Sequence, residues 1–173
     1  MAVEVRIHDG DFKRLLNNER PNAAISGIER FWAHRADPSK PDYRLTEAEA
    51  TIHRVRTYFG EVMSCGHACI LKRIDDEELG EIEAALEAVS LSAAIEVLAE
   101  ARQLMVHRQT VTGAVKWTNL SKDRLRQLNR LIGEIRRNDD ADAALELSEA
   151  KALLVFARAN VDDILRPERG LGW

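Results

Sequence analysis

An arginine and a histidine five residues apart, Arg102 and His107, are the pair in this sequence best suited to carry out a reaction. A neutral imidazole can accept the proton of a ribose 2′-hydroxyl group, and a guanidinium group can hold a phosphate while negative charge develops on it. Two such groups suit the cleavage of RNA, and this chemistry needs no metal ion. Gln103 and Arg108, which directly follow the two residues, could support them.

Residues 90–107 are predicted to form the helix that positions this pair. Its expected apolar stripe contains the arginine itself and has members three or four positions apart: Leu91, Ile95, Leu98, Arg102 and Met105. An arginine within such a stripe is costly unless it is paired or lies at an interface. An ideal helix would also point Arg102 and His107 about 140° apart. The two side chains should therefore converge only if the helix ends near His107 or if a second subunit completes the site.

A purely structural interpretation of the same residues stays open. Arginine often lays its aliphatic stem along apolar surface and keeps its charged end in water. In that interpretation Arg102 extends to solvent and His107 simply lies at a helix end.

The segment Arg102-Gln103-Leu104-Met105-Val106-His107 resembles the Arg-x(4–6)-His signature of the HEPN family (higher eukaryotes and prokaryotes nucleotide-binding). A helix leads into the motif, and a loop then precedes Leu120-Ser121-Lys122-Asp123-Arg124-Leu125, which opens another helix. This order is similar to that of the abortive-infection branch of the family. The resemblance covers about residues 45–137, and Gln103 stands where the family usually has Asn, Asp or His.

The resemblance implies a helical bundle that forms a homodimer, in which the two motifs meet and build a composite RNA-cleaving site. It implies that Arg102 and His107 are the catalytic residues and that no cofactor is needed. It also implies a role in defence or toxin systems, and some family members keep the fold without cleaving RNA.

Charge is strongly segregated along the chain, although the formal net charge is only −4. Residues 75–100 contain nine acidic residues and no Lys or Arg, whereas residues 101–137 contain nine Lys or Arg and two acidic residues. Either these neighbouring segments pair across their exposed faces, or the basic segment binds a polyanion such as RNA. The candidate nucleic-acid-binding residues are Lys116, Lys122, Arg124, Arg126 and Arg130.

Cys65 and Cys69 could offer two thiolates to a zinc ion from one face of a helix. His67 would lie about 200° from Cys65 around that helix and could not join them. Two ligands do not close a tetrahedral site, so we predict no metal site and no cofactor. The chain also lacks the Glu-x-x-His pairs of di-iron bundles, a phosphate-binding glycine loop and a hydrolase nucleophile elbow. Whether the two cysteines do more than pack stays open.

Helical periodicity along most of the chain predicts an all-α fold, an up-and-down antiparallel helical bundle with extra N-terminal and C-terminal helices. We expect an N-terminal extension over residues 1–44, with short helices at 11–18 and 22–35 and a Pro-containing linker at 37–42. The bundle domain should span residues 45–166, and residues 167–173 should form a tail.

Within the bundle, helices are expected over residues 46–73, 75–89, 90–107, 121–137 and 141–165. Gly66 inside the first of these suggests that a second backbone packs closely against it. Residues 110–119 interrupt the periodicity and are predicted to be a loop. Whether Ser90 or Ser92 caps a new helix or lies within a continuous one is left open by the sequence.

No apolar run approaches the roughly 20 residues that cross a bilayer, and the N-terminus lacks the apolar core of a signal peptide. Together with the absence of a disulfide framework, this predicts a cytoplasmic protein with no membrane partner. The expected partners are RNA and a second copy of the chain or another protein. The alternative to catalysis is a non-catalytic helical interaction module, or a subunit of a larger assembly, whose acidic and basic faces dock partners.

Overall fold

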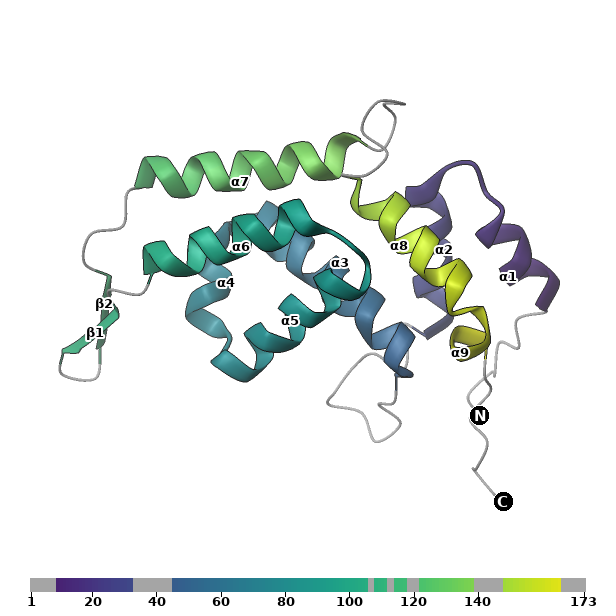
Figure 1. Cartoon of the computed structure of the whole chain (residues 1–173), viewed down its shortest axis with the longest axis horizontal. Coiled ribbons are helices and arrows are strands. Elements are labelled where there is room, and N and C mark those ends of the chain that lie inside the picture. Colours follow the sequence, from purple (N-terminus) through teal and green to yellow (C-terminus); the bar gives the residue numbers. More distant parts are fainter. Residues whose placement is uncertain are drawn as a thin grey trace, which may run out of the picture.

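The computed structural model describes residues 9–32, 45–105, 108–111, 114–117, 122–138 and 148–165, and these are mostly helical, as predicted (Figure 1). The helices are α1 (Asp9–Leu16), α2 (Pro21–Trp32), α3 (Glu47–Cys65), α4 (His67–Arg73), α5 (Asp76–Ala88), α6 (Ser92–Met105), α7 (Lys122–Arg137), α8 (Glu149–Ala159) and α9 (Val161–Leu165). Two short strands, β1 (Arg108–Val111) and β2 (Ala114–Trp117), lie between α6 and α7. Within these described ranges, no helix combines the length and apolar character needed to cross a membrane.

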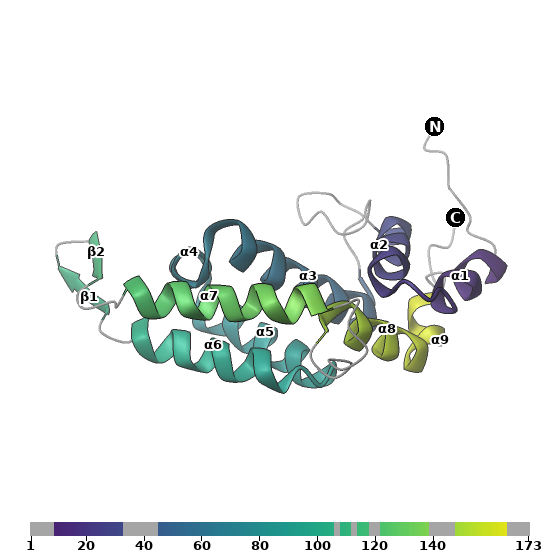
Figure 2. The same ribbon diagram turned by 90° about the horizontal axis from the view of Figure 1, so that it is seen from above.

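The helices form two neighbouring groups, which Figures 1 and 2 show side by side. Helices α3 to α7 make up one group, in which α5, α6 and α7 alternate in direction. The other group consists of α1, α2, α8 and α9, so helices from both ends of the sequence pack together. Helix α3 contacts α5 and α7 in the first group and α8 and α9 in the second. Together with α7, which also contacts α8, it therefore joins the two groups.

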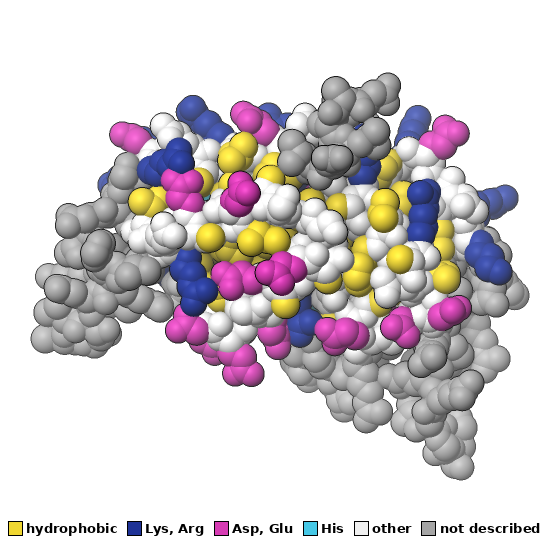
Figure 3. Space-filling model, in the orientation of Figure 1, with side chains coloured by type: hydrophobic (Ala, Val, Ile, Leu, Met, Phe, Trp, Pro, Cys, Tyr) yellow, Lys and Arg dark blue, Asp and Glu magenta, His cyan; other side chains and the backbone are white. Residues whose placement is uncertain are grey.

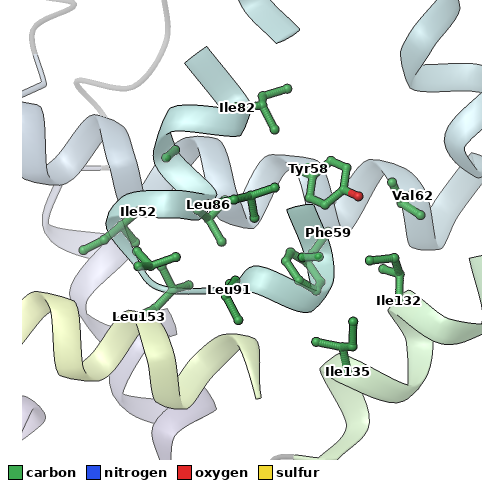
Figure 4. Packing of buried hydrophobic residues seen from close by; sticks show 14 of the residues in the cluster. Ile52, Tyr58, Phe59, Val62, Ile82, Leu86, Leu91, Ile132, Ile135 and Leu153 are labelled. Atoms are coloured by element: carbon green, nitrogen blue, oxygen red, sulfur yellow. The ribbon is translucent and has the colours of Figure 1, made fainter. Parts of the chain in front are cut away.

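Charged side chains of both signs are scattered over the surface in Figure 3, with apolar side chains between them, and a continuous set of apolar side chains fills the interior (Figure 4). Helix α3 supplies one face of this core with residues three or four positions apart, namely Ile52, Val55, Tyr58, Phe59 and Val62. Burial of each large apolar side chain contributes roughly 1.5–3 kcal/mol. The core also includes Trp32 of α2 and Leu153 of α8, so both helix groups share it.

Helices α3 and α5 begin where local sequence signals predicted. The Oγ1 atom of Thr46 accepts a hydrogen bond from the Glu49 N–H group at 3.2 Å, and Glu49 Oε2 accepts one from the Thr46 N–H group at 3.0 Å. Asp75 and Glu78 form the same reciprocal arrangement at the start of α5. Each capping box satisfies two backbone donors that a helix start would otherwise leave unpaired.

The helix predicted over residues 46–73 is interrupted at Gly66, which separates α3 from α4. Gly66 has a φ angle of +80°, a value that favours glycine because a Cβ atom is strained there. A Cβ atom at this position would also lie 2.5 Å from Nδ2 of Asn129 in α7. The close neighbour of Gly66 is therefore a side chain, and the prediction of a second backbone was wrong.

Helices α5 and α6 are separate, which answers the question left open at Ser90 and Ser92. Ser90 has a φ angle of 61°, and the Leu91 N–H group donates to the Leu86 carbonyl oxygen at 3.0 Å. Helices commonly end with one residue in the left-handed backbone conformation, after which the next N–H group donates to a carbonyl oxygen of the last helical turn. Helix α6 then begins at Ser92.

Residues 108–117 contain an antiparallel hairpin, so the prediction of a loop over residues 110–119 was wrong for the described part of that segment. Arg108 pairs with Trp117, and Val111 pairs with Ala114. Only Thr112 and Gly113 separate these last two residues, a spacing typical of tight hairpins. Figure 1 shows the hairpin beyond the end of α6.

The helix predicted over residues 141–165 is represented by α8 and α9, which are separated at Asn160. Residues 139–147 lie outside the described residues. Ala150, Leu154 and Ala157 are buried, as predicted for the inward face. Asn160 donates from its side-chain amide to the Phe156 carbonyl oxygen at 2.9 Å, so its side chain satisfies an acceptor in the last turn of α8.

Candidate functional site

Arg102 lies in the last turn of α6, at the edge of the buried face of that helix. Its side chain is 43% exposed, so the prediction that it lies within the buried stripe was wrong. The buried face consists of Leu91, Ala94, Val97, Leu98 and Ala101. Two of these residues are alanines. The predicted stripe left them out because it was assigned from large apolar side chains.

The Arg102 guanidinium group is paired with two carboxylates of α5. Its Nη1 atom lies 3.2 Å from Oε1 of Glu83, and its Nη2 atom lies 3.5 Å from Oδ1 of Asp76. Arg102 therefore links the two acidic helices α5 and α6. Because the group is well hydrated, these contacts belong to the class of exposed ion pairs that contribute about 0–1 kcal/mol.

The catalytic His107 and the supporting Gln103 and Arg108 of the prediction are only partly placed. Gln103 is exposed on α6, and Arg108 is the first residue of β1. His107 lies outside the described residues, so the convergence of Arg102 and His107 stays a prediction. The described backbone shows that α6 ends at Met105 and that a strand begins at Arg108.

The predicted nucleic-acid-binding residues fall on two elements. Lys122, Arg124, Arg126 and Arg130 are exposed on α7, and Lys116 lies in β2. Arg124 pairs with Glu100 of α6, and Arg126 pairs with its own neighbour Asp123 at 2.8 Å. Figure 3 shows basic and acidic side chains interspersed over this face of the molecule. At Arg102 and Arg124, basic residues thus pair with the acidic helices, as one of the two charge interpretations expects.

A buried polar cluster that the sequence did not predict lies at the break between α3 and α4. The His67 side chain is fully buried between Tyr58 of α3 and Asn129 of α7. Its Nε2 atom lies 3.0 Å from the Tyr58 hydroxyl oxygen, and its Nδ1 atom lies 2.7 Å from Oδ1 of Asn129. That same amide oxygen accepts the His67 backbone N–H group at 3.0 Å. Since Oδ1 can only accept, Nδ1 carries the imidazole proton and Nε2 accepts the hydroxyl proton of Tyr58.

Burial determines the ionisation of this cluster. It lowers the pKa of His67, although the hydrogen bond to Asn129 acts in the opposite direction, and it raises the pKa of Tyr58. Hydroxyl, imidazole and amide are connected in the order of a nucleophile, a base and an orienting group. However, Tyr58 and His67 are both 0% exposed, so a substrate has no direct access to either of them. The cluster is structural, and it fastens α4 and α7 to α3.

A second unpredicted cluster is a buried network of charges centred on Glu149, the first residue of α8. The Glu149 side chain is 0% exposed and lies 3.1 Å from Nη1 of Arg56 and 3.4 Å from Nε of Arg136. Arg56 also lies 3.3 Å from Glu29 of α2. Burial alone would lower the pKa of Arg56, but Glu149 and Glu29 raise it above its ordinary value. The network joins α2, α3, α7 and α8, with two positive and two negative charges.

The sequence carried no clear signal for either cluster. Glu149 follows Ser148, whose hydroxyl oxygen accepts a hydrogen bond from the Lys151 N–H group at 3.4 Å. An acidic residue directly after a helix cap is usually a solvated first-turn residue. The burial of Glu149 follows from helices that are distant in the sequence.

The two cysteines lie on either side of the break at Gly66. Cys65 is exposed at the end of α3, and Cys69 is half-buried in α4. The Cys65 sulfur atom lies 3.7 Å from Glu61 Oε2 and 3.8 Å from Arg73 Nη2. Among the residues that the structure describes, no group of three or more His, Cys, Asp or Glu side chains is placed to hold a metal ion.

Comparisons of this chain with models of protein families, with curated proteins and with solved structures found no match.

Proposed function

We propose that this protein is a HEPN-like, metal-independent ribonuclease that acts as a homodimer. Arg102 binds the scissile phosphate, and His107 acts as general base or general acid, with Gln103 and Arg108 in support. The observation that supports the proposal is the position of Arg102 at the surface, in the last turn of α6, shortly before His107 in the sequence. A guanidinium group there can reach a substrate or a second subunit, which a buried one could not.

The ion pairs of Arg102 are compatible with phosphate binding. Asp76 has a side chain that is 93% exposed, and its 3.5 Å contact is of the weak, solvent-screened kind. A phosphate can accept two parallel hydrogen bonds from one guanidinium group, which makes it a stronger ligand than a single carboxylate oxygen. RNA would therefore replace Asp76 while Glu83 continues to orient the arginine.

The remaining parts of the proposal concern assembly and substrate. The alternating directions of α5, α6 and α7 agree with the up-and-down bundle that the HEPN resemblance implies. As the HEPN resemblance implies, the active site is composite, with each subunit contributing to it. Lys122, Arg126 and Arg130 lie exposed on α7, where they could hold the RNA backbone. In this proposal the protein works in the cytoplasm as part of a defence or toxin system.

A second candidate function is that of a non-catalytic helical interaction module. The ion pairs of Arg102 with Glu83 and Asp76, and of Arg124 with Glu100, favour it. These contacts explain both arginines as links between neighbouring helices without any substrate.

The experiment that separates the two candidates is incubation of the purified protein with mixed RNA in EDTA. A ribonuclease of the proposed kind cleaves RNA under these conditions, and Arg102→Ala and His107→Ala each slow cleavage at least about 100-fold, the scale of acid–base and electrostatic contributions. Arg30→Ala and His53→Ala serve as matched controls, because they remove the same side-chain types from the surface of α2 and from α3. Both controls should cleave like the unmodified protein.

Intact RNA at high protein concentration would exclude the ribonuclease and leave the interaction module. Cleavage that persists in both Arg102→Ala and His107→Ala would exclude this active site.

A further inference from the structure

We infer that Asp76 competes with a substrate phosphate group for Arg102, and that Glu83 is a positioning residue that holds the arginine during this exchange. The inference rests on the phosphate-binding role proposed for Arg102 and adds an autoinhibitory contact to that site. It depends on three differences between the two carboxylates, which are the nitrogen atoms they contact, their exposure and their places in α5.

The two carboxylates contact different nitrogen atoms of the arginine. Nη1 lies 3.2 Å from Oε1 and 3.5 Å from Oε2 of Glu83, whereas Nη2 lies 3.5 Å from Oδ1 of Asp76. Because the guanidinium group is planar and rigid, holding Nη1 fixes the direction of the whole group. Nε and Nη2 form a fork of parallel N–H donors that suits a phosphate group. Asp76 therefore contacts one of the two nitrogen atoms that a phosphate would use.

The two carboxylates also differ in exposure. The Glu83 side chain is 31% exposed, and that of Asp76 is 93% exposed. Water and salt screen the contact of a highly exposed carboxylate most strongly, so such a contact is the weaker of the two. An incoming anion should therefore displace Asp76 and leave Glu83 in place.

The position of Asp76 in its helix lowers the cost of that displacement. Asp76 is the first residue of α5, where the positive end of the helix dipole stabilises a carboxylate whether or not it contacts Arg102. Glu83 lies in the middle of the same helix, beyond the first turn to which this effect is confined. Asp76 can release the arginine and keep a favourable environment, which Glu83 cannot.

An internal competitor weakens binding by a constant factor. The apparent dissociation constant for phosphate rises by the reciprocal of the fraction of molecules in which Nη2 is released from Asp76. Exposed ion pairs have strengths that correspond to factors of up to about fivefold. Removing the Asp76 charge should therefore improve phosphate binding by about two- to fivefold.

The first test uses inorganic phosphate as the probe and requires no cleavage. Phenylglyoxal modifies accessible guanidinium groups, and peptide mass spectrometry can follow the modification of Arg102 as phosphate is raised at constant ionic strength. We expect phosphate to protect Arg102, and Asp76→Asn to lower the half-protecting phosphate concentration about two- to fivefold. Glu83→Gln should raise that concentration at least about threefold, because Nη1 loses its charged partner.

Glu77→Gln is the matched control, since it removes the same charge from the same turn of α5, about 100° around the helix from Asp76. It should keep the half-protecting concentration of the unmodified protein. Circular dichroism checks that each variant is folded. A variant that is folded but less stable keeps this concentration too, so a shift reports on the site itself.

The second test is steady-state cleavage of an RNA oligonucleotide in EDTA. Asp76→Asn should lower KM about two- to fivefold without lowering kcat, because the competitor acts only before RNA is bound. Glu83→Gln should lower kcat at least about tenfold, because a misdirected guanidinium group no longer meets the charge that develops on the phosphate. Protection of Arg102 that follows the expected order without any cleavage would support this inference and exclude the ribonuclease.

Other outcomes would overturn the inference. Cleavage with the same KM in Asp76→Asn and in the unmodified protein would do so while leaving the ribonuclease intact. The inference is also wrong if phosphate fails to protect Arg102, if Asp76→Asn and Glu77→Gln shift the half-protecting concentration equally, or if Glu83→Gln leaves it unchanged.

Discussion

His67 is a histidine whose hydrogen bonds require a neutral ring. Asn129 can only accept at Oδ1, so Nδ1 donates to it, and Nε2 is the acceptor of the Tyr58 hydroxyl proton. A protonated Nε2 atom would instead donate to the Tyr58 hydroxyl oxygen, and the buried hydroxyl proton would lose its acceptor. Burial lowers the pKa of His67 in the folded protein, whereas an unfolded chain has a histidine pKa of about 6.5. Below about pH 6.5 the unfolded state therefore binds a proton more readily than the folded state.

The first prediction is a loss of stability in mild acid. The contribution of His67 to the free energy of unfolding should be fully present above about pH 6.5 and should be lost as the pH falls below that value, by at most about 1.4 kcal/mol per pH unit. Urea unfolding of the unmodified protein at pH 7.5 and pH 5.5 measures this loss. His67→Gln should be less stable at both values and show a smaller difference between them.

His53→Gln, a change at a half-buried position of α3, should keep the full pH dependence. An equal difference in the unmodified protein and in His67→Gln would show that another group causes the acid sensitivity.

At the residue scale, the sequence pointed to individual residues of interest but did not predict how exposed they are or which side chains surround them. Arg102 was singled out from its position among apolar neighbours, but Ala94 and Ala101 occupy the buried face and Arg102 is half-exposed at its edge. His67 was considered only relative to the two cysteines on one continuous helix. The break at Gly66 moved it into the core, where Tyr58 and Asn129 surround it.

Gly66 determines how α3 and α4 meet, and its replacement is the prediction at the scale of elements. Gly66→Ala places a Cβ atom at a φ angle of +80° and 2.5 Å from the amide of Asn129, which holds His67. Backbone strain of about 1–2 kcal/mol and weakened hydrogen bonds should together lower the free energy of unfolding by about 2–4 kcal/mol. Chemical denaturation provides the measurement.

Gly60→Ala is the matched control for this prediction, because Gly60 lies within α3 and a Cβ atom there would meet nothing within 4 Å. This change should stabilise the protein by about 0.5–1 kcal/mol. A Gly66→Ala variant as stable as Gly60→Ala would show that the junction tolerates a side chain.

At the element scale, local signals predicted the ends of helices well and their interruptions poorly. The starts of α3 and α5 follow from a hydroxyl or carboxyl residue with a glutamate three positions later. Apolar periodicity continues through Val62, Gly66 and Ile70, so the break between α3 and α4 left no trace in it. The hairpin was missed because its strands have four residues each, too few to display an alternating pattern.

The charge network around Glu149 ties the two helix groups together, and the prediction at the scale of the molecule concerns it. Glu149→Gln leaves the largely buried Arg56 with Glu29 as its remaining carboxylate partner in that network. Breaking a buried pair from one side typically costs 3–5 kcal/mol, which for a chain of this size lowers Tm by roughly 6–20 °C. Thermal unfolding followed by circular dichroism would measure the change.

Glu87→Gln, at an exposed position near the end of α5, should leave Tm within about 2 °C. If the two variants melt at the same temperature, the network contributes no net stability to the molecule.

The arrangement of the whole molecule was the least predictable level. Helical content followed from composition and periodicity. The packing of α2 on α8 joins segments far apart in the chain, and such a contact leaves no local pattern in either one. For the same reason Glu29, Arg56 and Glu149 could not be recognised as one network.

The packing of α2 on α8 also has a consequence for synthesis on the ribosome. The apolar face of α2, which includes Ile25, Ile28 and Trp32, leaves the exit tunnel long before α8 has been translated. The two helices are separated by roughly 120 residues, which at 5–20 residues per second corresponds to about 6–25 s. During that interval the nascent chain presents an uncovered apolar helix, which is the kind of segment that chaperones bind.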